Sequence, residues 1–293
     1  MMDEGSRSLS GEDDLMNVYV ERPPVPGLAG AVRTVWIQRT GESTYVQRHL
    51  PTGGVEIHLA IGGRPQLIGP LTGPQLEIIP ARTTIVGVRF LPGTAPPLAT
   101  ALHELVDQHL DLTDLWGRAE DRLLEAIAIT ETPERALMAL QAHLVQAYRR
   151  RVGGADPLVG EAVKALMPWH PVDVNTVATR LGLSASQLRR RCLHTVGLTP
   201  KVLQRTLRFQ GFLALAQAGS MVTGQRDADG LAGMAIEAGY ADQAHLNREC
   251  LRLTGLTPYQ LLSGGINQCT CGHDHSASFT PFLANHSGPT RRA

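Results

Sequence analysis

The residues of this chain best suited to chemistry gather near its C-terminal end, in the segment CTCGHDH. Its ligand-type side chains occupy alternate positions, namely Cys269, Cys271, His273 and His275. Two thiolates and two imidazoles are the ligand set of a tetrahedral zinc site, and thiolates also suit Cu(I). The spacing differs from the usual C-x2-C and H-x3-H of zinc sites, so holding one ion with all four requires a tight backbone. The cluster predicts metal or thiol chemistry, with zinc or another thiophilic metal as the candidate cofactor.

Other interpretations of this segment stay open. It could be a partial metal site that histidines of the N-terminal half complete. Cys269 and Cys271 could instead form a redox pair, which the short loop between them would strain. Finally, the segment could be a flexible tail in which these residue types are incidental.

A second group of polar residues lies in the N-terminal half, where His49, Glu56 and His58 fall within a few positions of one another. Glu56 and His58 are two residues apart, so on a strand they point to the same face. They could line a ligand pocket or bind a metal, or they could be ordinary strand residues. The chain contains no phosphate loop, no H-E-x-x-H and no G-x-S-x-G motif, so we expect no enzyme.

The elements that must position these residues change in character along the chain. Before about residue 97, short apolar runs alternate with Gly/Pro clusters, which is typical of a small β-barrel or sandwich. Residues 98–150 carry helical periodicity, and the rest of the ordered chain is expected to be helical. We therefore predict an α+β protein with four parts: a disordered tail (1–15), a β-rich sensor and dimerisation domain ending in helices (16–153), an all-α domain (157–264) and a Cys/His-containing tail (265–293).

Composition limits the function classes. The 293 residues include 27 Lys and Arg against 27 Asp and Glu, so no polybasic character runs from end to end. Four cysteines are too few for a disulfide-stapled secreted scaffold. The chain has neither an apolar run of about 18 residues nor a signal peptide. We expect a cytoplasmic protein without a membrane partner.

The helical domain contains an internal repeat, formed by residues 177–200 and 234–258. Cys192 aligns with Cys250 and Gly197 with Gly255, at an offset of 58. Each copy is expected to be a helix, a Gly-containing turn and a second helix that a polar residue caps, Ser184 in the first copy. This is the pattern of a helix-turn-helix, whose second helix can enter the DNA major groove.

Charge supports DNA binding by the first copy. Between Arg180 and Arg208 there are seven basic residues and no acidic residue. Such a stripe attracts phosphates through counterion release. An ordinary solvated helix face is the alternative, but the stripe coincides with the expected recognition helix.

These residues resemble the DNA-binding domain of the AraC/XylS family of transcription regulators. The resemblance covers about residues 158–264, and its most specific stretch is GYADQAHLNRECLRLTGLTPYQ at 239–260. It implies two helix-turn-helix units joined by a long helix from Thr199 to about Ala218. The chain departs from the family pattern at Cys192 and Cys250, where Phe is usual, and in the longer loop at 219–230. Residues 86–98 and 110–117 resemble the sensor half of certain actinobacterial-type members.

The resemblance also implies which residues face DNA. For base contact it indicates Ser186, Arg189 and Arg190 in the first unit and Gln243, His245, Asn247 and Arg248 in the second. Candidates for phosphate contact are Arg191, Lys201, Arg205 and Arg252.

The sequence therefore predicts a transcription regulator that reads the major groove of double-stranded DNA with two recognition helices. By the resemblance it is a homodimer, joined through the helices of 98–150, and an effector controls it through the N-terminal domain. That effector, a small molecule or a metal, is unidentified, and RNA polymerase is a further partner if the protein is an activator. One alternative is a metal- or redox-responsive regulator that uses the CTCGHDH cluster. The other is a metal-dependent enzyme that its DNA-binding domain directs to DNA.

Overall fold

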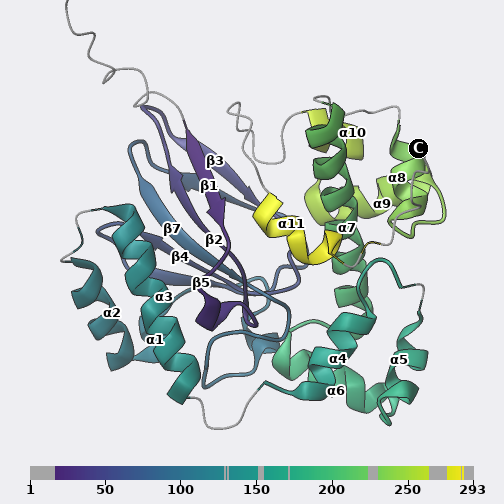
Figure 1. Ribbon diagram of the computed structural model, residues 1–293, viewed down its shortest axis with the longest axis horizontal. Coiled ribbons are helices and arrows are strands. Elements are labelled where there is room, and N and C mark those ends of the chain that lie inside the picture. The colour runs from purple at the N-terminus through teal and green to yellow at the C-terminus, as the bar shows by residue number, and fades with distance from the viewer. Residues whose placement is uncertain are drawn as a thin grey trace, which may run out of the picture.

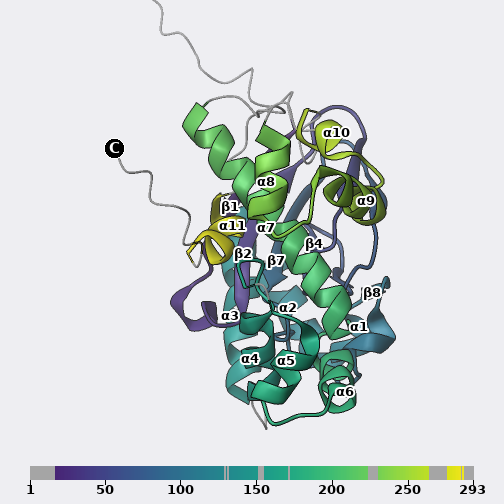
Figure 2. The ribbon, with the colours of Figure 1, turned by 90° about the vertical axis from the view of Figure 1, so that its right-hand side faces the viewer.

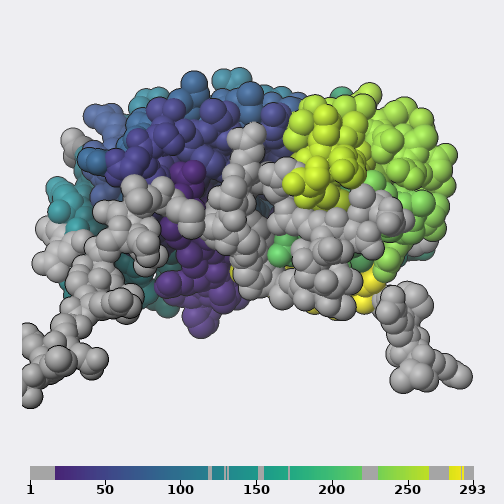
Figure 3. Space-filling model, turned by 90° about the horizontal axis from the view of Figure 1, so that it is seen from above, coloured from purple at the N-terminus to yellow at the C-terminus, as the bar shows by residue number. Residues whose placement is uncertain are grey.

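The computed structural model describes residues 17–128, 130, 132–150, 155–170, 172–223, 230–263, 276–284 and 286. A sheet-rich N-terminal unit and a helical C-terminal unit lie side by side (Figures 1 and 3). The tail expected at 1–15, the CTCGHDH cluster and residues 224–229 of the loop expected at 219–230 lie outside the described residues. None of the described helices is long and apolar enough to cross a membrane.

The N-terminal unit contains two antiparallel sheets. The larger sheet has the strand order β1 (Val18–Arg22), β2 (Val32–Arg39), β7 (Thr84–Phe90), β4 (Glu56–Ala60), β5 (Pro65–Ile68) and β8 (His109–Asp111). The smaller sheet pairs β3 (Tyr45–His49) with β6 (Gln75–Ile79). The predicted β-rich domain is confirmed, and no pairing among the described strands closes it into a barrel.

Side-chain alternation divides the larger sheet into an apolar and a polar face. On β4, Ile57 and Leu59 are fully buried in the apolar core beneath α2 (Arg118–Ala128) and α3 (Pro133–Arg150). Glu56 and His58 point to the opposite face, as their spacing predicts, toward the smaller sheet and the helical unit. The period-2 pattern thus directs the polar residues of the strands into the space between the two units.

Gly87 on β7 is needed because Trp36 lies across it. Gly87 pairs with Trp36 on one side and with His58 on the other. A Cβ atom on Gly87 would lie 2.1 Å from the Trp36 indole. The absence of a side chain lets the indole reach over β7, where its ring meets the His58 ring edge-on at 4.8 Å between centroids.

The helix expected over residues 98–110 is wrong. This stretch forms the short 3-10 helix η3 (Leu102–Leu105) and the edge strand β8. Asp107 takes a φ of 57°, which ends helical geometry, and β8 then pairs with β5. The pairing of β8 with β5 therefore determines the structure of this stretch, although its apolar residues recur with helical periodicity. Downstream, helices α1 (Thr113–Trp116), α2 and α3 confirm the rest of the helical prediction.

The helical unit is built around one long buried helix, α7 (Pro200–Thr223), whose Phe209 and Phe212 are fully buried. The helices packed around it are α4 (Pro157–Ala165), α5 (Val174–Arg180), α6 (Ala185–Thr195), α8 (Leu231–Glu237), α9 (Gln243–Thr254) and α10 (Pro258–Ser263). The last described helix, α11 (Ser276–Leu283), lies between α7 and strands β1 and β2 (Figures 1 and 2). Helix α11 thus joins the two units.

We predict that Gly87→Ala lowers the free energy of unfolding by at least about 1–3 kcal/mol, because the added methyl group overlaps the indole. Urea denaturation followed by tryptophan fluorescence measures this. Gly160→Ala in α4 is the control, since its Cβ would meet nothing within 4 Å. Alanine is the better helix former, so the control should be neutral or stabilising. Equal stability of Gly87→Ala and its parent would contradict the packing of Trp36 across β7.

Candidate functional site

The first helix-turn-helix consists of α5 and α6. Asp173 caps α5 by accepting hydrogen bonds from the N–H groups of Asn175 and Thr176. Gly182 in the turn has a φ of 68°, a conformation that glycine adopts without strain. Ser184 and Gln187 then form a complete capping box at the start of α6. The turn and the cap that the sequence predicts are confirmed.

The second helix-turn-helix, α8 and α9, repeats this construction. Gly239 has a φ of 82° in the turn. The Asp242 carboxylate accepts a hydrogen bond from the His245 N–H at 2.6 Å and so caps α9. In both copies, a glycine turn and a side-chain N-cap therefore position the second helix.

Equivalent residues of the two copies are buried in one core. Leu188 and Leu246 are fully buried, as are Cys192 and Cys250. Burial raises the pKa of the Cys192 thiol to about 11 and that of the Cys250 thiol to about 12. Both cysteines are therefore protonated core residues, as their repeat positions predict.

The polar faces of the two second helices are open to solvent. On α6, Ser186, Arg189 and Arg190 are exposed. On α9, Gln243 and Arg248 are exposed, whereas His245 and Asn247 are half-buried. His245 also accepts a hydrogen bond from the Ala241 N–H through Nδ1 at 3.3 Å. The residues that the sequence predicts to contact bases thus lie at the surface of each unit, with His245 partly engaged by the turn before α9.

Several of the residues indicated for phosphate contact have partners within the protein. Arg191 Nη1 lies 2.6 Å from Asp156 Oδ2, which also caps α4. Arg205 Nε lies 2.7 Å from Glu249 Oε2 and so joins α7 to α9. Carboxylates from outside the acid-free stretch therefore reduce its local charge. Two other members of the group, Lys201 and Arg252, are exposed.

Two family models match the chain. A helix-turn-helix domain model matches residues 177–264, the segment that contains both units. This segment is an AraC-type DNA-binding domain. A model for a domain of unknown function, DUF6597, matches residues 20–111, which include strands β2 to β8 and the last three residues of β1. The resemblance found in the motifs of the second half is thereby confirmed.

Solved structures of ToxT from Vibrio cholerae resemble the chain loosely over most of its length. A ligand-free lysine-to-alanine variant has a TM-score of 0.45 at 10% identity and covers 78% of this chain and 96% of its own. ToxT from strain O395 has a TM-score of 0.42 at 10% identity, with 78% and 95% covered. ToxT with a bound unsaturated fatty acid has a TM-score of 0.38 at 12% identity, with 84% and 93% covered. No curated protein sequence matches the chain.

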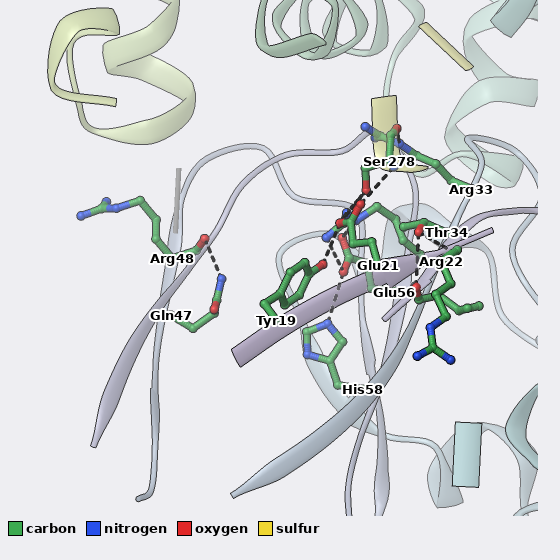
Figure 4. A network of polar contacts seen from close by, with 12 residues as sticks. Tyr19, Glu21, Arg22, Arg33, Thr34, Gln47, Arg48, Glu56, His58 and Ser278 are labelled. Carbon is green, nitrogen blue, oxygen red and sulfur yellow. Dashed lines mark hydrogen bonds and ion pairs between the residues drawn. The ribbon is translucent and has the colours of Figure 1, made fainter. Parts of the chain in front are cut away.

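A buried ionic network lies between the AraC-type domain and the polar face of the larger sheet (Figure 4). Arg89 on β7 pairs with Glu56 at 2.7 Å and with Glu21 on β1 at 3.2 Å. Ser278 of α11 closes the network, since Arg89 donates to its Oγ at 2.6 Å and its N–H donates to Glu21 at 3.0 Å. The Ser278 carbonyl accepts from buried Arg33, whose pKa burial lowers to about 9.

The network also fixes His58, because Glu56 Oε2 lies 3.3 Å from His58 Nε2. Burial would raise the pKa of Glu56, but Arg89 and His58 together lower it well below its usual range. Burial lowers the pKa of His58. At neutral pH the pair is therefore an ionised carboxylate and a neutral imidazole.

The structure adds a residue that the sequence pattern missed. His49 and His58 come together as the pattern suggests, with ring centroids 5.2 Å apart. The carboxylate nearest His49 is Glu77 of β6, at 2.7 Å from Nε2, whereas Glu56 is held by Arg89. The hydrogen bond from His49 lowers the pKa of Glu77. Glu77 is 28 positions from His49, and only the pairing of β3 with β6 brings them together.

We predict that Arg190→Ala weakens binding to the specific DNA site by about 1–3 kcal/mol and relaxes the preference at one base pair, because it removes a bidentate donor to guanine. Titration of the specific duplex and of single-mismatch duplexes measures both effects. The matched comparison is Arg191→Ala, which removes the neighbouring guanidinium that pairs with Asp156; because Arg191 is predicted to contact phosphate only, this variant should leave the base preference unchanged. If Arg190→Ala leaves the DNA affinity and the footprint unchanged, the assignment of α6 as a recognition helix is wrong.

Proposed function

We propose that the protein is a sequence-specific transcription regulator that reads DNA with α6 and α9 under the control of its N-terminal unit. The observation that carries this proposal is the pair of capped, solvent-facing second helices within a segment that matches the AraC-type domain. Arg189 and Arg190 suit guanine, while Gln243 and Asn247 suit adenine. Catalysis is not part of the proposal, and a DNA target agrees with the cytoplasmic location expected from the sequence.

The arrangement of the two units on α7 supports reading of two successive stretches of major groove. α6 ends just before α7 begins, and α9 packs on the same helix, where its Glu249 pairs with Arg205 (Figures 1 and 2). The expected connector thus exists and continues to Thr223. Recognition helices held by one rigid helix suit binding sites about 34 Å apart, one turn of DNA.

Contacts at equivalent positions of the repeat support control by the N-terminal unit. A Cβ on Gly197, just after α6, would lie 2.7 Å from Pro70 and 2.8 Å from the Leu102 carbonyl oxygen. At the end of α9, Arg48 of β3 donates a hydrogen bond to the Thr254 carbonyl at 2.9 Å. The sheet-rich unit therefore touches both reading helices at their C-terminal ends. A change in that unit would alter how the two helices are held relative to each other.

We propose a homodimer through α2 and α3, where Met138 is 61% exposed, with RNA polymerase as a further partner if the protein activates transcription. A cavity of about 410 Å³ beside these helices, lined by Trp116, Leu123 and His143 among others, has the size of a small-molecule site. A small-molecule effector would fit there. The CTCGHDH cluster, which could take a metal effector, lies outside the described residues.

The test of this proposal is capture of bound genomic DNA followed by footprinting of the recovered motif. We expect two protected major-groove stretches about one turn apart. Arg190→Ala should weaken one stretch, and Asn247→Ala combined with Arg248→Ala should weaken the other, because each change affects one helix. Binding should also fall steeply with salt.

Lys164→Ala serves as the control, since Lys164 lies on α4 and pairs with Glu161. It should leave both protected stretches intact. A single protected stretch that both sets of variants weaken equally would contradict reading by two helices. A flat salt response would contradict phosphate contact altogether.

A further inference from the structure

We infer that His49, His58 and Glu77 form a binding site for one divalent transition-metal ion, for which zinc is the best match. We further propose, resting on the function proposed above, that this ion is the signal that the N-terminal unit senses. Its three residues do not belong to the CTCGHDH segment and come from three strands, β3, β4 and β6.

The distances suit a single ion. One ligand atom from each residue lies within 4.8 Å of the others, and His49 Nε2 is 2.7 Å from Glu77 Oε2. Ligand bonds of about 2.0–2.2 Å in a tetrahedral site place ligand atoms about 3.4 Å apart. Shifts of about an ångström in side-chain position would therefore bring all three to an ion. Two imidazoles and one carboxylate are a ligand set that zinc commonly takes, with water in the fourth position.

A second layer of contacts orients the histidine at the centre. Glu56 engages His58 Nε2 and is itself held by Arg89. Because Nε2 is occupied, Nδ1 is the nitrogen left to bind an ion, and among the described residues it has no hydrogen-bond partner. A carboxylate on the outer nitrogen of a histidine ligand is the usual support of metal sites. Trp36, packed edge-on against the ring, further limits its rotation.

The space at the site favours an ion over an organic molecule. His49 and His58 line a cavity of about 70 Å³, together with Gln47 and Thr52. Small-molecule sites are usually about 300–1,000 Å³, whereas one water occupies about 30 Å³ in the liquid. The cavity therefore fits an ion with its water. His109 of β8 is the next imidazole, with its ring centroid 6.5 Å from that of His58.

The site is directly connected to the DNA-reading unit. His49 is preceded by Arg48, which bonds the end of α9, and two residues after it the Pro51 carbonyl accepts a hydrogen bond from Gln210 of α7 at 2.8 Å. An ion that draws His49 toward His58 would move both of these contacts. Ion binding and the positions of α7 and α9 are therefore coupled through four consecutive residues, 48–51, at the end of β3 and in the loop after it.

The binding test uses the full-length chain with Cys269→Ser, Cys271→Ser, His273→Ala and His275→Ala, so that the C-terminal cluster offers no thiolate or imidazole. Calorimetric titration with Zn²⁺ should give one ion per chain, and Zn²⁺ should raise the melting temperature. Titration with Co²⁺ should give a tetrahedral visible spectrum without a thiolate charge-transfer band. Glu77→Gln or His58→Ala should weaken Zn²⁺ binding at least 100-fold.

Glu42→Gln is the matched control, since Glu42 is exposed and pairs with Arg82 on the same unit; it should leave Zn²⁺ binding unchanged. Glu77→Gln keeps the shape of the side chain, so a melting curve without metal shows that the variant folds. Absence of binding in the chain that lacks the C-terminal ligands would overturn the site. Undiminished binding by both Glu77→Gln and His58→Ala would do the same.

The signalling role is tested by titrating the specific duplex with and without Zn²⁺ in the same background. We expect at least a five-fold change in DNA affinity, and its loss in Glu77→Gln. Zinc binding without any change in DNA affinity would overturn the signalling role and leave the metal site standing. If no DNA is bound under any condition, the proposed function and the signalling role both fail, while the calorimetric result still decides the metal site.

Discussion

The buried Arg89 network is the interaction on which the rest of the structure depends. One guanidinium joins β7 to β4 through Glu56, to β1 through Glu21 and to the C-terminal helix α11 through Ser278. Removing one partner of such a buried pair costs about 3–5 kcal/mol, because the remaining charge has no water to solvate it. The network therefore holds the strands of the sheet and helix α11 together and fixes the orientation of His58.

The same arrangement connects the sheet-rich unit directly to the helical unit. Arg33 donates to the Ser278 carbonyl and lies over the rings of Phe279 and Phe282, and Trp169 donates to the Phe282 carbonyl. One short helix is thus bonded both to the sheet and to the helical unit. The Arg48 and Gln210 hydrogen bonds form a second connection on the other side of the cavity. A polar cavity between two such connections is a suitable position for a controlling ligand, because movement there reaches both units.

The duplicated unit also meets the N-terminal unit at equivalent positions. Gly197 and Gly255 occupy equivalent positions after α6 and α9, both with positive φ, and both lie against the N-terminal unit. The same turn geometry that ends α6 and α9 thereby brings backbone close to the N-terminal unit. The structure also reduces the positive charge expected for residues 180–208, because Asp156 pairs with Arg191 and Glu249 pairs with Arg205. Arg189 and Arg190 are left as exposed cations of α6 directed to solvent.

The sequence by itself determined what depends on neighbours a few positions away. Caps such as Ser184 and Asp242, the turns at Gly182 and Gly239 and the buried repeats Cys192 and Cys250 follow from spacing along one helix or turn. Only the tertiary structure decided which carboxylate meets which cation or imidazole. Glu77 reaches His49 through strand pairing, β8 replaces an expected helix by pairing with β5, and Ser278 meets Arg89 across 189 positions. Such contacts depend on how distant segments pack, and no local pattern of residues encodes them.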